Sequence, residues 1–503
     1  WLSSLAGALR DRADIIAHHY VTALENAEAS GHAVPELRLA ASNALQAAAE
    51  RAGSLHSHAA AARLWEKALE LCPRDDDRRP RLLLALGKAL ALADEPAAPT
   101  LDEAAAQLLE AGDLSGAAEA ESTSAWLLSV AGKPEQARGR DSRALELVRD
   151  AAPSRVKALI LSSVGAHSVF VRELRDEVLR VLEEALSIAR ELGLREIEAE
   201  ALQFVGIARL DAGDEGGVRD IESALATASE LNSPVSLACY GNLADMLRYL
   251  GSLRASAALH LEGERAAGRF GIPVQVRRFR AEQACDLFYS GEWDEAVAHV
   301  EEYLDAIEAG SPHRGVGEAR LHRGRIRLAR GDAEGALEDA EAALAFARKT
   351  AEPFNLFPAL AFHASASAER TPEQAEASVA ELLAGLAAGQ PFWGAWCLPE
   401  LVGVADEERL AELKGVLARA TPHTRWYDAV SAAIDGDHAR AADLYAAIGS
   451  KPDEAVAALR AAEQYVTAGN DVRAKDHLAR CLAFFSRVGA HTYMRDAEML
   501  VSR

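Results

Sequence analysis

Two short stretches decide the fold: Leu287-Phe-Tyr-Ser-Gly-Glu-Trp-Asp-Glu-Ala296 and Leu328-Ala-Arg-Gly-Asp-Ala-Glu-Gly-Ala336. In each, a glycine (Gly291 or Gly331) follows an amphipathic segment, and an alanine stands five residues after that glycine. A glycine just past a helix end can adopt the left-handed backbone conformation that closes the helix. Each stretch therefore predicts one helix, a tight turn at the glycine and a second helix.

The same pattern recurs along the chain, with a small residue seven positions before the glycine and a mostly small residue five positions after it. Small side chains at these positions let two antiparallel helices approach closely where they cross. The glycines that carry the pattern are Gly112, Gly132, Gly213, Gly251, Gly291, Gly331, Gly436 and Gly469. One helical hairpin cannot bury its apolar stripe alone, so successive hairpins must stack on one another.

The repeat predicts an all-α fold: a right-handed superhelical solenoid of about 11 or 12 antiparallel helical hairpins, without strands. Weaker hairpins are expected at 33–72, 154–192 and 353–388, whereas the aromatic-rich stretch Gln390–Pro399 interrupts the rhythm. We therefore divide the chain into a solenoid over 1–388, irregular aromatic-rich repeats over 389–430, and terminal repeats with a closing helix over 431–503.

The composition favours a helical chain that binds neither nucleic acid nor membranes. Half of its 503 residues are hydrophobic but only 6% are aromatic, so alanine and leucine, both good helix formers, carry the apolar mass. A net charge of −23 argues against a surface that grips phosphates or anionic lipids. No apolar run approaches the roughly 20 residues that span a bilayer, and no signal segment is apparent.

Five widely spaced cysteines form neither a disulfide framework nor a zinc spacing, which suits a reducing compartment. We therefore expect a cytoplasmic chain. It begins at Trp1 rather than at a methionine, and we expect it to be a piece of a longer polypeptide.

The repeat resembles the tetratricopeptide repeat, and Gly-Glu-Trp-Asp-Glu-Ala at 291–296 is its best local match. The middle glycines are 38 to 40 residues apart, longer than the roughly 34 residues of that family, which predicts a wider superhelix. Longer segments resemble the C-terminal helical region of bacterial, actinobacterial-type signalling proteins that carry a class III adenylate/guanylate cyclase domain and a STAND-type ATPase domain. These segments are 15–25, 61–73, 81–90 and 483–500. The resemblance implies a sensor or scaffold, with the ATPase and cyclase chemistry upstream of Trp1.

Motifs for catalysis are missing from this chain, so we expect it to be no enzyme and to hold no cofactor. Gly87-Lys88 fails as a phosphate loop, because Leu82 replaces the first glycine and Ala89 replaces the serine or threonine. Neither a Gly-x-Ser-x-Gly elbow nor a His-Glu-x-x-His zinc motif occurs. The adjacent His18 and His19 point about 100° apart on a helix and cannot chelate together, so no metal site is expected.

The tetratricopeptide resemblance implies a binding surface. In that family the first helix of each hairpin lines the concave face, and ligands meet residues 13, 10, 9, 6, 3 and 2 positions before the anchor glycine. Transferred to this sequence, the implied residues are Asn242, Arg248, Tyr249, Arg278, Glu282, Tyr289, His322 and Arg325, with Asp245, Phe288 and Glu318 beside them. The three arginines could form a positive groove for a carboxylate or phosphate. Alternatively, each arginine pairs with a glutamate of the next helix.

Two further clusters leave alternatives open. Arg320, Arg323, Arg327 and Arg330 share one helical face, which indicates a solvated face or ion pairs to Glu338 and Asp339 rather than a ligand site. Phe392, Trp393 and Trp396 could anchor a partner or line a pocket, or they could fill the gap left by an imperfect repeat.

Three functions follow from these expectations. The first is a non-catalytic interaction or sensor module of a larger signalling ATPase or nucleotide cyclase, which binds a peptide or protein partner, or upstream domains of its own polypeptide, on its concave face. The second is a small-molecule effector-binding sensor of a STAND-type regulator, which would require an enclosed pocket rather than an open groove. A helical enzyme with an unrecognised site is the third.

Overall fold

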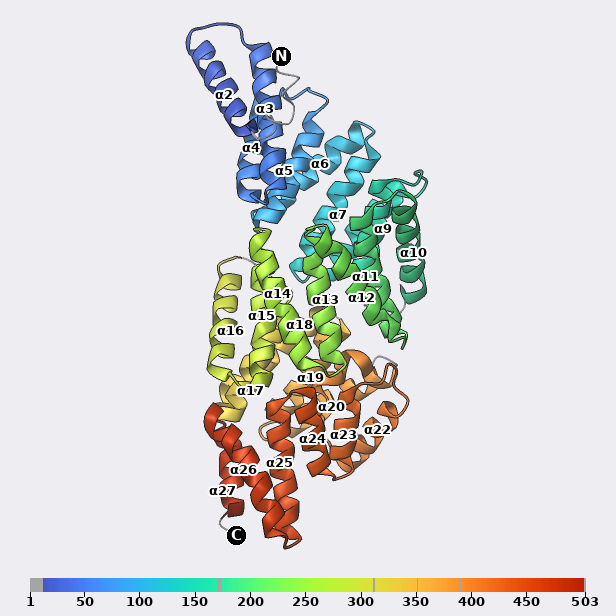
Figure 1. The fold of residues 1–503 in the computed structure, drawn as a ribbon, viewed down its shortest axis with the longest axis vertical. Coiled ribbons are helices and arrows are strands. Elements are labelled where there is room, and N and C mark those ends of the chain that lie inside the picture. Colours follow the sequence, from blue (N-terminus) through green and yellow to red (C-terminus); the bar gives the residue numbers. More distant parts are fainter. Residues whose placement is uncertain (1–11, 170–173, 311–312, 351, 389–390, 502–503) are drawn as a thin grey trace. The chain divides into compact units, whose positions relative to one another are not determined.

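The computed structural model describes residues 12–169, 174–310, 313–350, 352–388 and 391–501 (Figure 1). Every regular element in these ranges is a helix and none is a strand, so the predicted all-α fold is confirmed. Trp1 and Gln390, which belong to the predicted segments, lie outside the described residues. None of the described helices is both long enough and apolar enough to cross a lipid bilayer.

The chain forms two compact units. The first comprises residues 1–168, 180–198 and 265–276, and the second comprises residues 169–179, 199–264 and 277–503. Four helices contribute residues to both units, namely α10, α11, α14 and α15. This division does not coincide with the predicted boundaries at 389 and 431, because residues 199–264 and the last hairpins belong to one unit.

The first unit contains α2 (Ala13–Ala29), α3 (Pro35–Ser54), α4 (His58–Leu71), α5 (Arg79–Ala93), α6 (Ala98–Glu110), α7 (Leu114–Val130), α8 (Pro134–Val148), α9 (Arg155–Ser168) and most of α10 (Arg175–Glu191). The predicted hairpins at 33–72 and 154–192 correspond to α3 with α4 and to α9 with α10. Gly165 of α9 makes room for Leu182 of α10, since a Cβ added at Gly165 would lie 2.3 Å from Cδ2 of Leu182.

The second unit begins with α11 (Arg195–Asp211), α12 (Gly216–Glu230), α13 (Val235–Tyr249), α14 (Leu253–Arg269), α15 (Pro273–Ser290), α16 (Trp293–Glu308), α17 (Val316–Arg330), α18 (Ala333–Thr350), α19 (Pro353–Ser367) and α20 (Pro372–Ala387). It continues through the short helix η3 (Pro391–Cys397), α21 (Pro399–Val402), α22 (Glu407–Leu417), α23 (Arg425–Ile434), α24 (His438–Ile448), α25 (Lys451–Thr467), α26 (Asp471–Val488) and α27 (His491–Val501). From α3 to α20, and again from α23 to α26, the described helices pair into eleven hairpins, as the sequence predicts.

All eight glycines of the sequence pattern adopt the predicted left-handed conformation, with φ between +68° and +94°. Glycines that close the second helix of a hairpin share this conformation; they are Gly193, Gly271, Gly310, Gly449 and Gly489. One assignment needs correction. Gly112 and Gly132 flank the same helix, α7, so both cannot be the turn within a hairpin. Because α7 packs closely against α8, α7 is the first helix of that hairpin and Gly132 is its turn. Gly112 therefore lies between two hairpins.

The small residues of the pattern lie where the two helices of a hairpin cross. At the crossing of α11 and α12, a Cβ added to Gly217 would lie only 2.1 Å from the carbonyl oxygen of Gly206. Ala244 and Ala284 occupy the equivalent position in later hairpins and are fully buried. A larger residue at any of these positions would push the helices apart, which explains why the pattern requires alanine or glycine.

Within the second unit, the last hairpins pack across the turns of earlier ones. The Arg425 guanidinium donates to the Gly251 carbonyl (3.4 Å), and the Thr492 hydroxyl donates to the Leu328 carbonyl (3.1 Å). The Arg330 guanidinium donates to the carbonyl of Val488 (3.1 Å). Segments that are distant in sequence therefore pack together at the C-terminal ends of α13 and α17.

Candidate functional site

The inner face of α13, α15 and α17 carries polar residues at intervals of three or four, so the residues of each helix share one side. On α13 and α15 these residues are Asn242, Asp245, Arg248, Tyr249, Arg278, Glu282, Cys285 and Tyr289, and on α17 they are Glu318, His322 and Arg325. They include all eight residues predicted for the concave face. The structure brings all eight into the interior of the second unit.

Arg248 lies at the centre of this polar face and is only 2% exposed. Its Nη2 donates to Asp245 (3.0 Å) and its Nη1 donates to Glu282 (3.2 Å), while Nη1 lies 2.8 Å from Oε1 of Glu318. Burial alone would lower the pKa of Arg248, but the surrounding carboxylates, Glu318 first, raise it well above its ordinary value. Arg248 therefore holds three helices together as a permanent cation.

The two glutamates beside Arg248 have opposite pKa shifts. Burial raises the pKa of Glu282, and repulsion from Glu318 and Asp245 raises it further. The pKa of Glu318 is lowered because the attraction of Arg248, supported by His322, outweighs the effect of burial. The pair can therefore hold one proton on Glu282 while Glu318 stays ionised.

Arg278 is buried against the backbone of α13, where Gly241 makes room for it. A Cβ at Gly241 would lie 2.3 Å from Nη2 of Arg278. The nearest carboxylate contact of this guanidinium is 4.0 Å, to Asp245. Burial, followed by the positive charge of Arg314, lowers the pKa of Arg278.

The aromatic segment at η3 covers this polar face. Trp396 lies between two guanidinium groups, 5.4 Å from Arg248 and 5.0 Å from Arg325, measured to its ring centroid. Its ring stacks on His322 with centroids 5.8 Å apart. Arg325 also forms an ion pair with Glu400, which follows η3.

Phe392 and Trp393 extend the cover toward α13 and α11. Phe392 contacts the Tyr249 ring at 5.4 Å, and Nε1 of Trp393 donates to Asp211 (2.8 Å). Like Trp396, they are 2% exposed. This placement is the one expected if the aromatics fill the gap left by an imperfect repeat. Whether they also contact a partner remains a prediction.

The other predicted residues are also engaged inside the protein. Asn242 donates to Oε1 of Gln203 (2.8 Å), and the Tyr289 hydroxyl donates to the Trp396 carbonyl (3.4 Å). Of the four arginines that share one face of α17, Arg323 and Arg327 donate hydrogen bonds to Asp339. The predicted ion pairing with Asp339 is therefore confirmed.

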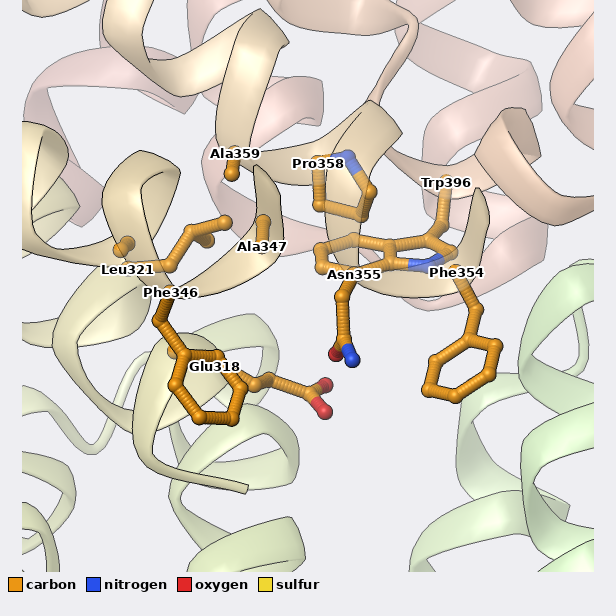
Figure 2. A pocket seen from close by; sticks show the side chains of 11 residues that line it. Glu318, Leu321, Phe346, Ala347, Phe354, Asn355, Pro358, Ala359 and Trp396 are labelled. Atoms are coloured by element: carbon orange, nitrogen blue, oxygen red, sulfur yellow. The ribbon is translucent and has the colours of Figure 1, made fainter. Parts of the chain in front are cut away.

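A pocket lies beside the polar cluster, between α17, α18, α19 and η3 (Figure 2). Its cavity volume is about 10 Å³, room for about one water molecule, so a larger ligand requires the lining side chains to move. The carboxylate of Glu318 points into this space, and the amide of Asn355 faces it (Figure 2). The remaining lining is mainly apolar, and its larger members are Leu321, Phe346, Phe354, Pro358 and Trp396.

Two polar groups at the pocket are notable. Asn355 is held in place by donating through Nδ2 to Glu352 (3.2 Å) and Thr350 (3.4 Å). The Nε1 of Trp396 is buried and has no hydrogen-bond partner among the described residues. A buried polar group without a partner is rare in folded proteins and calls for an explanation such as a bound ligand or water.

Two groups of described side chains have the composition and proximity of metal ligands: Cys285, Glu318 and His322, and Asp245, His260 and Glu282. His18 and His19 belong to neither group, and their ring centroids are 5.9 Å apart. In the second group, His260 already contacts Asp286 through Nδ1 (2.8 Å), and both carboxylates already bond to Arg248.

Cys285, Glu400, Phe346 and Asn355 were not among the residues predicted from the sequence. Cys285 stands six positions before Gly291, a position at which the repeat rule places ligand-facing residues, so the rule itself could have found it. Glu400 and Asn355 carry no such signal, because they come from the irregular region and from the edge of another hairpin.

Neither a protein family model nor a curated protein matches this sequence. Among solved structures, the chain is similar to a Rap protein complexed with Competence and Sporulation Factor, with 14% identity, a TM-score of 0.38, and coverage of 80% of this chain and 99% of that one. It is also similar to a STAND protein with a tetratricopeptide repeat sensor from Pyrococcus horikoshii, with 15% identity, a TM-score of 0.32, and coverage of 75% and 55%. For yeast Tom70 the identity is 13%, the TM-score 0.32, and the coverage 92% and 96%. These likenesses concern the helical-repeat fold alone.

Proposed function

We propose that this chain is a non-catalytic sensor module that binds a small effector in the pocket beside Glu318. The observation that carries the proposal is the meeting of an ionised carboxylate and a fixed amide, Asn355, in a hollow lined mainly by aromatic and aliphatic groups. Ligand sites typically combine such a largely apolar lining with a few converging polar groups.

The charges around the pocket favour an effector with a cationic or strongly hydrogen-bond-donating group. The pKa of Glu318 is lowered, chiefly by Arg248 acting against burial, so its carboxylate is ionised while one of its oxygens lies 2.8 Å from Arg248. Aromatic faces next to a carboxylate favour organic ammonium and guanidinium groups. An anionic effector would find Arg248 and Arg325 already bound to carboxylates.

Peptide binding on the concave face is the alternative, and the described contacts favour it less. Trp396 and Trp426 already contact the inner face, since Nε1 of Trp426 donates to the Arg248 carbonyl (2.8 Å). A peptide in contact with Arg248 or Tyr289 would first have to displace η3 and α23.

In a larger signalling protein, effector binding would stabilise the second unit and bias an ATPase or cyclase domain. The resemblance of the segments at 15–25, 61–73, 81–90 and 483–500 to such proteins supports this role. The energy for the bias would come from the difference in effector affinity between the two states of the larger protein.

A thermal-shift screen with small alkylammonium and guanidinium compounds, and with matched carboxylates, tests the proposal. We expect amines to raise Tm and carboxylates not to. Ala347→Leu, which fills the pocket, should abolish the shift. Ala345→Leu is the matched control, because Ala345 lies on the same helix but is exposed. No shift with any amine, together with a peptide-induced shift that survives Ala347→Leu, would refute the proposal.

A further inference from the structure

Cys285, Glu318 and His322 converge at the centre of the second unit. Glu318 and His322 are one helical turn apart on α17, and Cys285 comes from the facing side of α15. The Sγ of Cys285, one oxygen of Glu318 and one ring nitrogen of His322 all lie within 4.8 Å of one another. Three different ligand atoms from two helices therefore surround one point.

His322 provides a second, independent observation. Its side chain is fully buried, and neither ring nitrogen has a hydrogen-bond partner among the described residues. The nearest acceptor, Oε1 of Glu318, is 3.7 Å from Nε2, which is too long for a hydrogen bond. Stacking on Trp396 fixes the orientation of the ring, so the nitrogens are held in place without a partner. A buried imidazole in this state is costly unless something else binds it.

We propose that Cys285, Glu318 and His322 form a binding site for a zinc-class divalent metal ion. Thiolate, imidazole and carboxylate are the three ligand types that Zn²⁺ takes from proteins, whereas Mg²⁺ and Ca²⁺ require oxygen ligands. Tetrahedral zinc with bonds of about 2.0 to 2.3 Å separates its ligand atoms by roughly 3.3 to 3.8 Å. Small side-chain movements from the observed arrangement achieve this separation. Three protein ligands leave the fourth position for a water molecule or another donor.

The local charges accommodate the metal. On binding, the Cys285 thiol releases its proton to solvent as the sulfur–metal bond forms, so the thiolate and the Glu318 carboxylate together balance two positive charges. Arg248 stays close to Oε1 of Glu318 but is also bonded to Asp245 and Glu282. These carboxylates compensate the arginine when Glu318 turns toward the metal.

The second candidate group differs from the first, because only one ring nitrogen of its histidine, Nε2 of His260, is without a hydrogen-bond partner among the described residues. Its histidine, His260, already contacts Asp286 through Nδ1, and its carboxylates are engaged by Arg248. The inference about Cys285, Glu318 and His322 goes beyond the proposed effector pocket and does not depend on any effector.

Cobalt titration of the metal-free, reduced full chain tests the site. We expect one equivalent of Co²⁺ to bind, with d–d absorption of a tetrahedral ion and a near-ultraviolet thiolate-to-cobalt charge-transfer band. Cys285→Ser should abolish the charge-transfer band, and His322→Gln should weaken binding at least tenfold. Cys481→Ser is the matched control, since Cys481 is an equally buried cysteine outside the group and its loss should leave the band intact.

A second measurement uses the unmutated protein, in case Cys285→Ser does not fold. Under mild denaturation, Zn²⁺ should slow alkylation of Cys285, located by peptide mapping, at least tenfold relative to Cys481. No charge-transfer band, a band that survives Cys285→Ser, or equal alkylation of both cysteines with and without Zn²⁺ would overturn the proposal. Ala347→Leu should leave the cobalt spectrum unchanged, so failure of the metal site and failure of the effector pocket are distinguishable.

Discussion

The guanidinium of Arg248 lies 5.4 Å from the ring centroid of Trp396, although α13 and the short helix η3 are far apart in the sequence. A cation over an indole face is attracted by the ring, and the attraction is stronger when both groups are buried. This contact closes the inner face of the second unit, because the same indole also contacts Arg325 and His322. Four predictions concern this closure and the repeat that supports it.

Trp396→Ala should destabilise the second unit by about 3–5 kcal/mol, since it removes a fully buried indole and leaves a cavity. Denaturant unfolding, followed by circular dichroism, measures the change. Trp65→Ala is the control, because Trp65 is only partly buried and should cost much less. Equal losses for the two variants would contradict the role of Trp396 as the cover of the polar face.

Arg248→Met should destabilise the fold by about 3–5 kcal/mol, because it leaves buried carboxylates without their shared cation. Adding Glu318→Gln should recover part of the loss, with a coupling energy of about 1–3 kcal/mol in a double-mutant cycle. The exposed pair of Arg409 with Glu376 is the control, and Arg409→Met should change stability by less than about 1 kcal/mol. Strict additivity of Arg248→Met and Glu318→Gln would show that the two side chains do not interact.

Gly331→Ala should cost about 1 kcal/mol. Gly331 has φ of +94° and no atom within 4 Å of an added Cβ, so the whole cost comes from backbone strain. Gly139 also has open space around an added Cβ but lies inside helix α8, so Gly139→Ala should stabilise by up to about 1 kcal/mol. Urea midpoints that shift in the same direction for both variants would exclude the left-handed turn as the cause.

Asp453 should make stability depend on pH. Burial raises its pKa to about 6, despite a hydrogen bond donated by the Ser450 hydroxyl. A pKa above the unfolded value means that the protonated form favours the folded state below about pH 4. This contribution is lost as the pH rises through about 6. Asp453→Asn should therefore be more stable than the natural chain at pH 7.5 and nearly equal to it at pH 4. A stability difference that does not change between these pH values would contradict the shift.

Much of the fold is predictable because the repeat is local. The glycine at each turn and the small residues at each crossing follow from backbone geometry within one hairpin, and Gly206 with Gly217 shows why nothing larger fits. The candidate residues on α13, α15 and α17 were likewise found by their distance from the next glycine. Local spacing therefore predicts which residues face inward.

Pairing between distant hairpins is not predictable from such spacing. Nothing near Arg248 in the sequence shows that Trp396 will cover it, or that Glu400 will take the charge of Arg325. The division into two units depends on the same long-range packing. For this reason an open, positive groove was one expectation from the sequence, whereas the described inner face is closed and its arginines face carboxylates.

Hydrogen exchange of the η3 amides tests whether the chain's own aromatic segment covers the inner face of α13, α15 and α17 and so excludes a peptide from it. Exchange followed by mass spectrometry reports on the amides of residues 392–398. We expect protection of these amides close to that of α13 and α15, because opening the segment would expose Trp393 and Trp396. Exchange as fast as that of an unstructured peptide, with α13 and α15 still protected, would contradict it.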